Sequence, residues 1–74
     1  MITAAQCRAA RALLHITQDQ LATKSGVSQK AIANFELGKT TPMRANLIVL
    51  KQTLEQLGIE FLERDGVKRK AEQQ

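Results

Sequence analysis

The sequence has little of several residue types that mark particular classes of protein. Its 74 residues include two aromatic residues, Phe35 and Phe61, and no Trp or Tyr. Proteins that bind single-stranded nucleic acid stack the bases on aromatic side chains, so this composition argues against that class. The single Cys and single His, Cys7 and His15, exclude a disulfide framework and a cluster of Cys and His metal ligands within the chain. We therefore expect no metal and no cofactor.

Long apolar runs are also missing. The longest, Leu47 to Leu50, is far too short to cross a bilayer, and no signal peptide is evident. These absences favour a cytoplasmic protein without a membrane partner. Paired carboxylates and a nucleophile beside a base are lacking as well, so the sequence predicts that the protein is not an enzyme.

Positive charge is concentrated in the first part of the chain. The net charge of the whole sequence is +4. Residues 1–54 contain seven Lys and Arg against two acidic residues, a net charge of +5, whereas residues 55–74 contain four against five, a net charge of −1. A polyanion is the partner that such a distribution suits, although a basic soluble surface alone would give the same count.

Caps and hydrophobic periodicity predict four helices. Thr3-x-x-Gln6 and Thr17-x-x-Gln20 are capping boxes that start helices over 4–14 and 18–25, and Ser28 caps a helix over 29–36. In the first helix, Cys7, Ala10 and Leu14 face inward. A fourth helix begins at Pro42, carries Leu47, Leu50, Leu54 and Leu57 on one stripe, and stops at Gly58.

The second and third helices are joined at Gly26, which can adopt the left-handed conformation that ends a helix. Two short helices hinged in this way form a helix-turn-helix. In that arrangement the second helix can enter the major groove of DNA with its first residues against base edges.

The motif resembles the DNA-binding domain of lambda-repressor-like regulators, the XRE family. The matching stretch is Ile16-Thr17-Gln18-x-x-Leu21-Ala22-x-x-x-Gly26-Val27-Ser28-x-x-x-Ile32-x-x-Phe35-Glu36-x-Gly38-Lys39-x-x-Pro42, and the resemblance covers about residues 3 to 58. It implies an all-α fold, a compact helix-turn-helix bundle of about four helices. His15 stands where the family usually has glycine, and we expect it in the left-handed region.

The helix over 29–36 has a predicted reading face. Because Ile32 and Phe35 must face the core, the 3.6-residue period leaves four residues on the outer side. These candidate base-reading residues are Gln29, Lys30, Ala33 and Asn34. Glutamine and asparagine can pair with adenine, lysine can donate to guanine, and the alanine methyl can contact a thymine methyl. The resemblance implies the same positions, with Lys30 and Asn34 also able to reach phosphates.

Other residues are expected to position the protein on the DNA backbone. Gln18 resembles the family glutamine that contacts a phosphate at the amino end of its helix. The remaining candidate phosphate contacts are Ser28, Lys39, Thr40, Thr41 and Arg44. The resemblance also implies a structural ion pair between Arg11 and Glu36.

The residues after Gly58 depart from the commonest family pattern. Asp65-Gly66 predicts a two-residue turn in a short C-terminal β-hairpin over 59–70, followed by a disordered tail over 71–74. An isolated hairpin is barely stable, so this one must pack on the fourth helix or pair with a second copy of the chain. We favour a homodimer built from the fourth helix and the hairpin, in which the partner covers an apolar surface that Val49 adds beside the leucine stripe. A frayed tail on a monomer is the alternative.

The leading functional hypothesis is a sequence-specific regulator of transcription that binds double-stranded DNA at residues 1–58. It would act as a repressor, a homodimer on a palindromic operator. An antitoxin that represses its own operon, with a toxin as its partner, fits the same residues. A protein-interaction adaptor that does not bind DNA is the alternative from another class.

Overall fold

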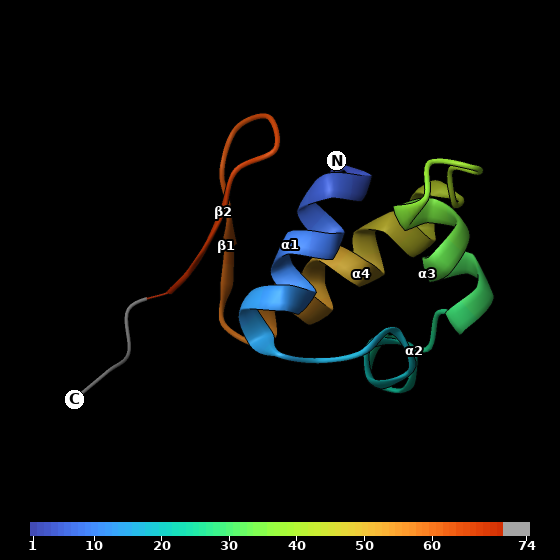
Figure 1. Ribbon diagram of the computed structural model, residues 1–74, viewed down its shortest axis with the longest axis horizontal. Coiled ribbons are helices and arrows are strands. Elements are labelled where there is room, and N and C mark those ends of the chain that lie inside the picture. Colours follow the sequence, from blue (N-terminus) through green and yellow to red (C-terminus); the bar gives the residue numbers. More distant parts are fainter. Residues whose placement is uncertain (71–74) are drawn as a thin grey trace.

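Four helices and a C-terminal two-stranded hairpin make up the chain in the computed structural model, which describes residues 1–70 (Figure 1). The elements in order are α1 (Ala4–Leu14), α2 (Gln18–Ser25), α3 (Gln29–Glu36), α4 (Arg44–Gln56), β1 (Ile59–Phe61) and β2 (Val67–Arg69). The predicted bounds of the first three helices are confirmed. The tail predicted over 71–74 lies outside the described residues.

The start and end signals of these helices act as their chemistry predicts. Both capping boxes are formed. The Thr3 hydroxyl accepts from the backbone N–H of Gln6, and the Thr17 hydroxyl accepts from that of Gln20, each at 3.0 Å. In return, the side-chain oxygen of each glutamine accepts from the backbone N–H of its threonine. His15 ends α1 in the left-handed region with φ of +57°. Gly26 ends α2 in the same region, where a residue without Cβ is unstrained.

The predicted start of α4 is wrong by two residues. Pro42 lies in the loop, Met43 is the extended residue before the helix, and α4 begins at Arg44. The fixed φ of proline suits an extended loop as well as a first helical turn, so proline alone does not locate the start. Met43 supplies no side-chain cap, and burial of Leu47, Leu50 and Leu54 holds α4 in place instead.

One hydrophobic core joins all four helices to the hairpin. The four helices and β1 contribute side chains with little or no exposed surface, among them Cys7, Ala10, Leu21, Ile32, Phe35, Leu50, Leu54 and Ile59, and β2 adds the partly buried Val67. Leu14, expected to face inward, packs against this core but is only partly buried. The core holds α3 against α1 and α2, which fixes the direction in which its outer side faces.

The hairpin is present, but its turn differs from the prediction. Pairing of the strands ends at Phe61 and Val67, so the connection spans residues 62–66 rather than two residues. Side-chain bonds from the start of α1 explain the longer loop: Gln6 Nε2 donates to the carbonyl oxygens of Leu62 and Gly66, both at 2.9 Å, and Thr3 Oγ1 donates to Asp65 at 2.8 Å. Contacts 56 or more residues apart in sequence are invisible to a local turn rule.

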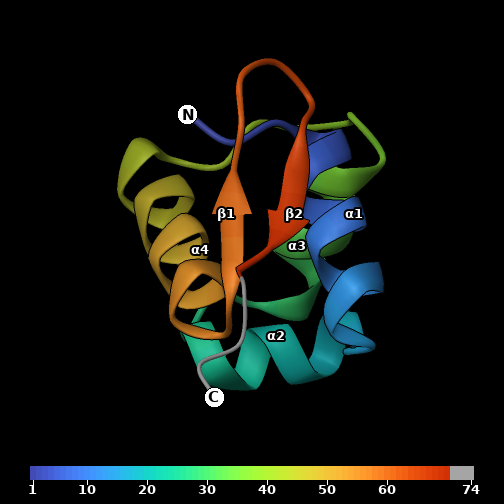
Figure 2. The ribbon, with the colours of Figure 1, turned by 90° about the vertical axis from the view of Figure 1, so that its left-hand side faces the viewer.

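The hairpin packs on its own chain. β1 lies along α4 and β2 along α1, and Ile59 is fully buried between the layers (Figure 2). The outer face of the hairpin is polar, and Lys68 Nζ lies 3.8 Å from Glu60 Oε1 on it. The alternative prediction, a frayed tail in place of a packed hairpin over 59–70, is therefore wrong. Val49, expected to add an apolar surface for a partner, is half-buried against the core, and its neighbour Ile48 is the more exposed apolar residue, at 40%.

Candidate nucleic-acid interface

The outer side of α3 is open over its first turn. Ile32 and Phe35 are buried in the core as predicted, whereas Gln29 and Lys30 are exposed. Ala33 and Asn34 are half-buried, and the Asn34 carbonyl accepts a bond from the Lys39 amide at 2.9 Å. Of the four predicted base-reading residues, the first two are thus the most accessible.

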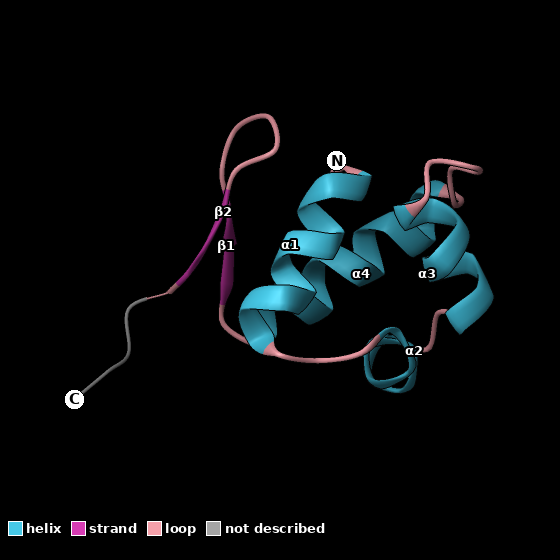
Figure 3. Cartoon of the chain, viewed as in Figure 1, coloured by secondary structure: helices cyan, strands magenta, loops and turns pink. Residues whose placement is uncertain are grey.

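The candidate phosphate contacts border α3 on two sides. α3 lies at the end of the molecule opposite the hairpin, with α2 on one flank and the loop 38–43 on another (Figures 1 and 3). Lys39, Thr40 and Thr41 on that loop and Arg44 at the start of α4 are all exposed. Cations and hydroxyls on a loop beside a projecting helix are the groups that DNA backbones bind.

Ser28 and Gln18 are already engaged within the protein. Ser28 Oγ accepts from the Ala31 amide at 3.1 Å, which is the cap of α3. Gln18, the first residue of α2, donates from Nε2 to Glu36 Oε1 at 3.0 Å and accepts from Gln29 Nε2 at 2.9 Å. Gln18, a predicted phosphate contact, and Gln29, a predicted base-reading residue, are therefore hydrogen-bonded to each other.

Glu36 is the centre of a buried polar cluster beneath α3. The residue is 4% exposed, and Arg11 donates to both of its carboxylate oxygens, with Nη2 to Oε1 at 2.6 Å and Nε to Oε2 at 2.8 Å. The ion pair implied by the resemblance is thus present. Cys7 donates its thiol hydrogen to Oε2 at 3.1 Å, and Arg8 donates to the Glu36 carbonyl.

These contacts keep the Glu36 carboxylate ionised. Burial alone would raise the pKa of Glu36, but hydrogen bonds from Arg11, Gln18 and Cys7 and the charge of Arg11 lower it below its usual value. Burial, with the hydrogen bond to Glu36, raises the pKa of the Cys7 thiol. Cys7 therefore stays protonated, as a hydrogen-bond donor to a carboxylate requires.

The helix-turn-helix formed by α2, a tight turn and α3, whose outer side is open, can be compared with known protein families. A protein-family model described as helix-turn-helix matches residues 8–62. The chain belongs to the XRE, lambda-repressor-like helix-turn-helix family. A search of curated proteins found no match.

Family membership gives the protein its general role. XRE helix-turn-helix domains bind double-stranded DNA and regulate transcription, and this family is one of regulatory domains rather than of enzymes. The helix-turn-helix pair within the domain is α2 and α3, and the matched range includes the cluster around Glu36. Within residues 1–70, no helix has the length and apolar character needed to span a membrane.

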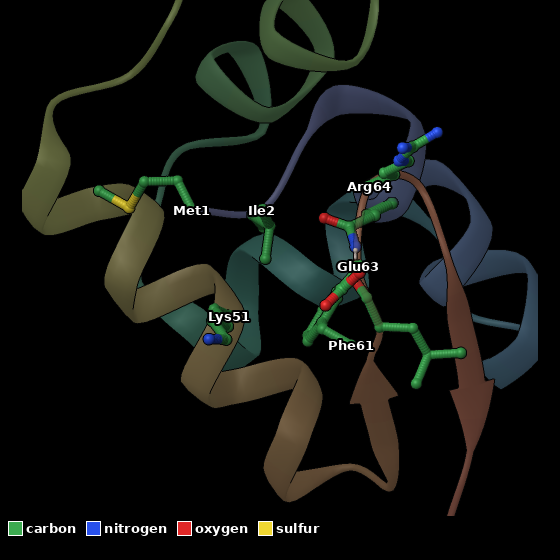
Figure 4. A pocket seen from close by; sticks show the side chains of 8 residues that line it. Met1, Ile2, Lys51, Phe61, Glu63 and Arg64 are labelled. Atoms are coloured by element: carbon green, nitrogen blue, oxygen red, sulfur yellow. Dashed lines mark hydrogen bonds between the residues drawn. The ribbon is translucent and has the colours of Figure 1, made fainter.

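A pocket at the hairpin loop is separate from the predicted DNA-binding residues on α2, α3 and the loop 38–43. It lies between the chain's first residues, α4 and the loop 62–66, and Lys51, Glu63 and Arg64 contribute charges of both signs (Figure 4). None of the predicted site residues lines it. We assign no ligand to this pocket.

Sequence reasoning missed the partners that surround Glu36. Cys7 was expected to pack as a small hydrophobic residue, and it is buried, but it also donates to the carboxylate. A signal was available: Cys7 and Arg11 are four residues apart, which places both on the side of α1 that meets Glu36. The contacts of Gln18 with α3 depend on how the two helices cross, which no local pattern specifies.

Proposed function

We propose that this XRE protein is a sequence-specific repressor that binds a palindromic operator as a homodimer. The supporting observation is the open first turn of α3, with Gln29 and Lys30 exposed beside the cationic loop 38–43. In this proposal the bases are read by Gln29, Lys30, Ala33 and Asn34. The DNA backbone is contacted by Gln18, Ser28, Lys39, Thr40, Thr41 and Arg44.

Selection of bound duplexes from a random pool tests the proposal. The expected consensus is a palindrome whose half-sites lie about one helical turn apart, about 34 to 36 Å, because two symmetric α3 helices must meet one face of the duplex. Binding of that duplex should weaken steeply as salt rises. Weak association with every duplex, independent of salt, would favour the adaptor hypothesis.

Lys39 should contribute to affinity without contributing to sequence preference. Lys39→Ala removes one phosphate contact per protomer, and therefore two in the dimer. Each contact contributes roughly 0.9 to the slope of log Kd against log salt, so the slope should decrease by about 2. Consensus and scrambled duplexes should be weakened by the same factor, as measured by fluorescence anisotropy over a salt series. Lys68→Ala, in β2 of the hairpin at the end of the molecule opposite α3 (Figure 1), is the matched control and should leave the slope unchanged.

The shape of the molecule bears on how two copies assemble. The chain measures 38 × 25 × 20 Å, and α3 and the hairpin lie at opposite ends of its long axis. Joining two copies hairpin to hairpin along this axis would place the two α3 helices too far apart for neighbouring half-sites. Joining them side by side suits the expected spacing. We therefore infer a homodimer in which α4 supplies the main contact and the hairpin contributes the edge of β1 beside it.

Ile48 is the exposed apolar residue of α4 that a second copy would cover. Ile48→Glu should shift the protein from dimer to monomer in sedimentation equilibrium and weaken operator binding, because it buries a charge in the interface. Ala12→Glu adds the same charge at an exposed position of α1 and should leave the dimer intact. A monomeric wild-type protein at micromolar concentration would contradict the inferred dimer.

The antitoxin hypothesis uses the same DNA surface and adds a toxin as a partner. A neighbouring toxin gene and copurification of its product with the protein would support it. In that case the repressed promoter is that of the protein's own operon, and the predictions for Lys39 and Ile48 stay the same.

A further inference from the structure

The hairpin leaves the backbone of β2 open along one edge. Lys70 N–H donates to the Gly58 carbonyl at 2.7 Å, so the backbone groups of Lys70 point between the two strands. Alternate residues of an antiparallel pair direct these groups toward the partner strand and away from it. The N–H and C=O groups of Val67 and Arg69 therefore point away from β1, and none of them forms a hydrogen bond within residues 1–70. An open edge of this kind is a template for another strand.

The surface of α1 beside this edge carries small side chains. β2 lies along α1, and Gln6 of α1 donates to the Gly66 carbonyl directly before β2 (Figure 2). Ala9 is three residues after Gln6 and therefore adjoins it on the helix surface, and Ala5 and Ala12 adjoin Ala9 in the same way. The first two alanines of this set are half-buried and the last is exposed. This alanine face leaves room for an extended chain to lie on α1 next to β2.

The charges on this edge are all positive. Lys68, Arg69 and Lys70 follow one another and are exposed. Lys68 has Glu60 across the hairpin at 3.8 Å, whereas Arg69 lies opposite the buried Ile59 and has no ion-pair partner within residues 1–70. Two copies of this edge would place like charges opposite each other, which destabilises a pair of strands. An acidic strand would be attracted where a second copy of β2 is repelled.

We propose that the open edge of β2 binds an extended acidic segment of a partner protein, which adds to the hairpin as a third strand. Main-chain bonds to Val67 and Arg69 would hold this strand, and its side chains would alternate between two surroundings. The outward ones lie beside Lys68 and should be acidic, whereas the inward ones lie on the alanine face and should be apolar. The site is independent of the proposed DNA binding, because β2 lies at the end of the molecule opposite α3 and the inferred homodimer uses α4 and the edge of β1.

A capped synthetic peptide of alternating glutamate and valine is the probe, titrated into the isotope-labelled full chain at neutral pH. Binding should shift the amide resonances of β2 and of the alanine face and leave those of α3 in place. Hydrogen exchange gives the sharper readout, because strand addition bonds the outward amides. Exchange of the Val67 and Arg69 amides should slow on saturation, whereas exchange of the Lys68 amide, which already points at β1, should not change.

A charge reversal tests whether the edge selects acidic strands. Arg69→Glu should raise the Kd of the acidic peptide roughly 2- to 30-fold, because an attractive charge pair between strands becomes a repulsive one. The same variant should bind a matched peptide of alternating lysine and valine more tightly than the wild type does. Lys24→Glu makes the same change in charge at an exposed position of α2 and should leave the Kd of the acidic peptide unchanged. Thermal melting followed by circular dichroism verifies that both variants are folded.

Several results would overturn the inference. Equal binding of the acidic and the lysine peptide by the wild type would show that the edge does not select charge. Shifts without slower exchange of the Val67 and Arg69 amides would show contact without strand pairing. Absence of any binding would mean that the cations only protect the edge from pairing with itself. If Arg69→Glu changes dimerisation in sedimentation equilibrium, the occupant of the edge is a second copy of the chain. Operator binding enters none of these measurements, so the proposed function is tested separately.

Discussion

Glu36→Ala should lower the free energy of unfolding by about 3 to 5 kcal/mol, the usual cost of leaving one member of a buried ion pair without its partner. Arg11 loses both of its carboxylate contacts, and Cys7 and Gln18 lose their acceptor. A domain of this size is stable by only about 4 to 11 kcal/mol. Urea unfolding at pH 7 should therefore show a protein that has lost a large part of its stability.

Glu60→Ala is the matched control for this change. Glu60 is exposed and its nitrogen-oxygen distance to Lys68 is 3.8 Å, so its loss should cost about 0 to 1 kcal/mol. Equal stability losses in the two variants would contradict the central role assigned to Glu36.

The same pair should make stability depend on pH. Because the pKa of Glu36 is lowered in the folded protein, its contribution is complete above the ordinary value of 4.5 and is lost as pH falls through the lowered value. The stability difference between wild type and Glu36→Ala should thus be largest near neutral pH and shrink in strong acid. Urea unfolding of both proteins across this pH range measures the difference directly.

Gln29→Ala should have the largest effect on DNA binding of any single surface change. Each lost base contact costs roughly 1 to 3 kcal/mol, and a homodimer on a palindrome loses two, so operator affinity should fall by roughly 2 to 6 kcal/mol. The reason is local: Gln29 is the first residue of α3, exposed and held by Gln18. Random-pool selection with the variant should give a consensus relaxed at one symmetric pair of positions.

Thr23→Ala, at an exposed position of α2 that belongs neither to the proposed DNA contacts nor to the proposed dimer contact, is the control for this experiment. It should leave both affinity and consensus as in the wild type. A Gln29→Ala variant that weakens all duplexes equally would assign the residue to the backbone contacts rather than to base reading.

The parts of the fold that depend on neighbouring residues could be predicted from the sequence. Capping boxes at Thr3 and Thr17, the Ser28 cap and the left-handed His15 and Gly26 are decided within a few residues, and the structure has each of them. The start of α4 was misplaced because proline at position 42 is compatible with both loop and helix.

Features that depend on distant contacts could not be predicted in this way. The hairpin loop follows bonds from Gln6 to Leu62 and Gly66, and the polar cluster joins Cys7 and Gln18 to Glu36. Exposure of Ile48 rather than Val49 depends on where α4 meets the core. For the candidate site, the outer side of α3 followed from helical periodicity, whereas the bond between Gln18 and Gln29 required the crossing of α2 and α3.

The claim on which the account depends is that the outer side of α3 contacts the DNA duplex. The most direct measurement is a nuclear magnetic resonance titration of isotope-labelled protein with the selected operator. The account predicts that the largest amide shifts occur at Gln29, Lys30, Ala33 and Asn34 and along the loop 38–43, with little change in β1 and β2. Shifts concentrated in the hairpin, with α3 unaffected at saturation, would contradict it.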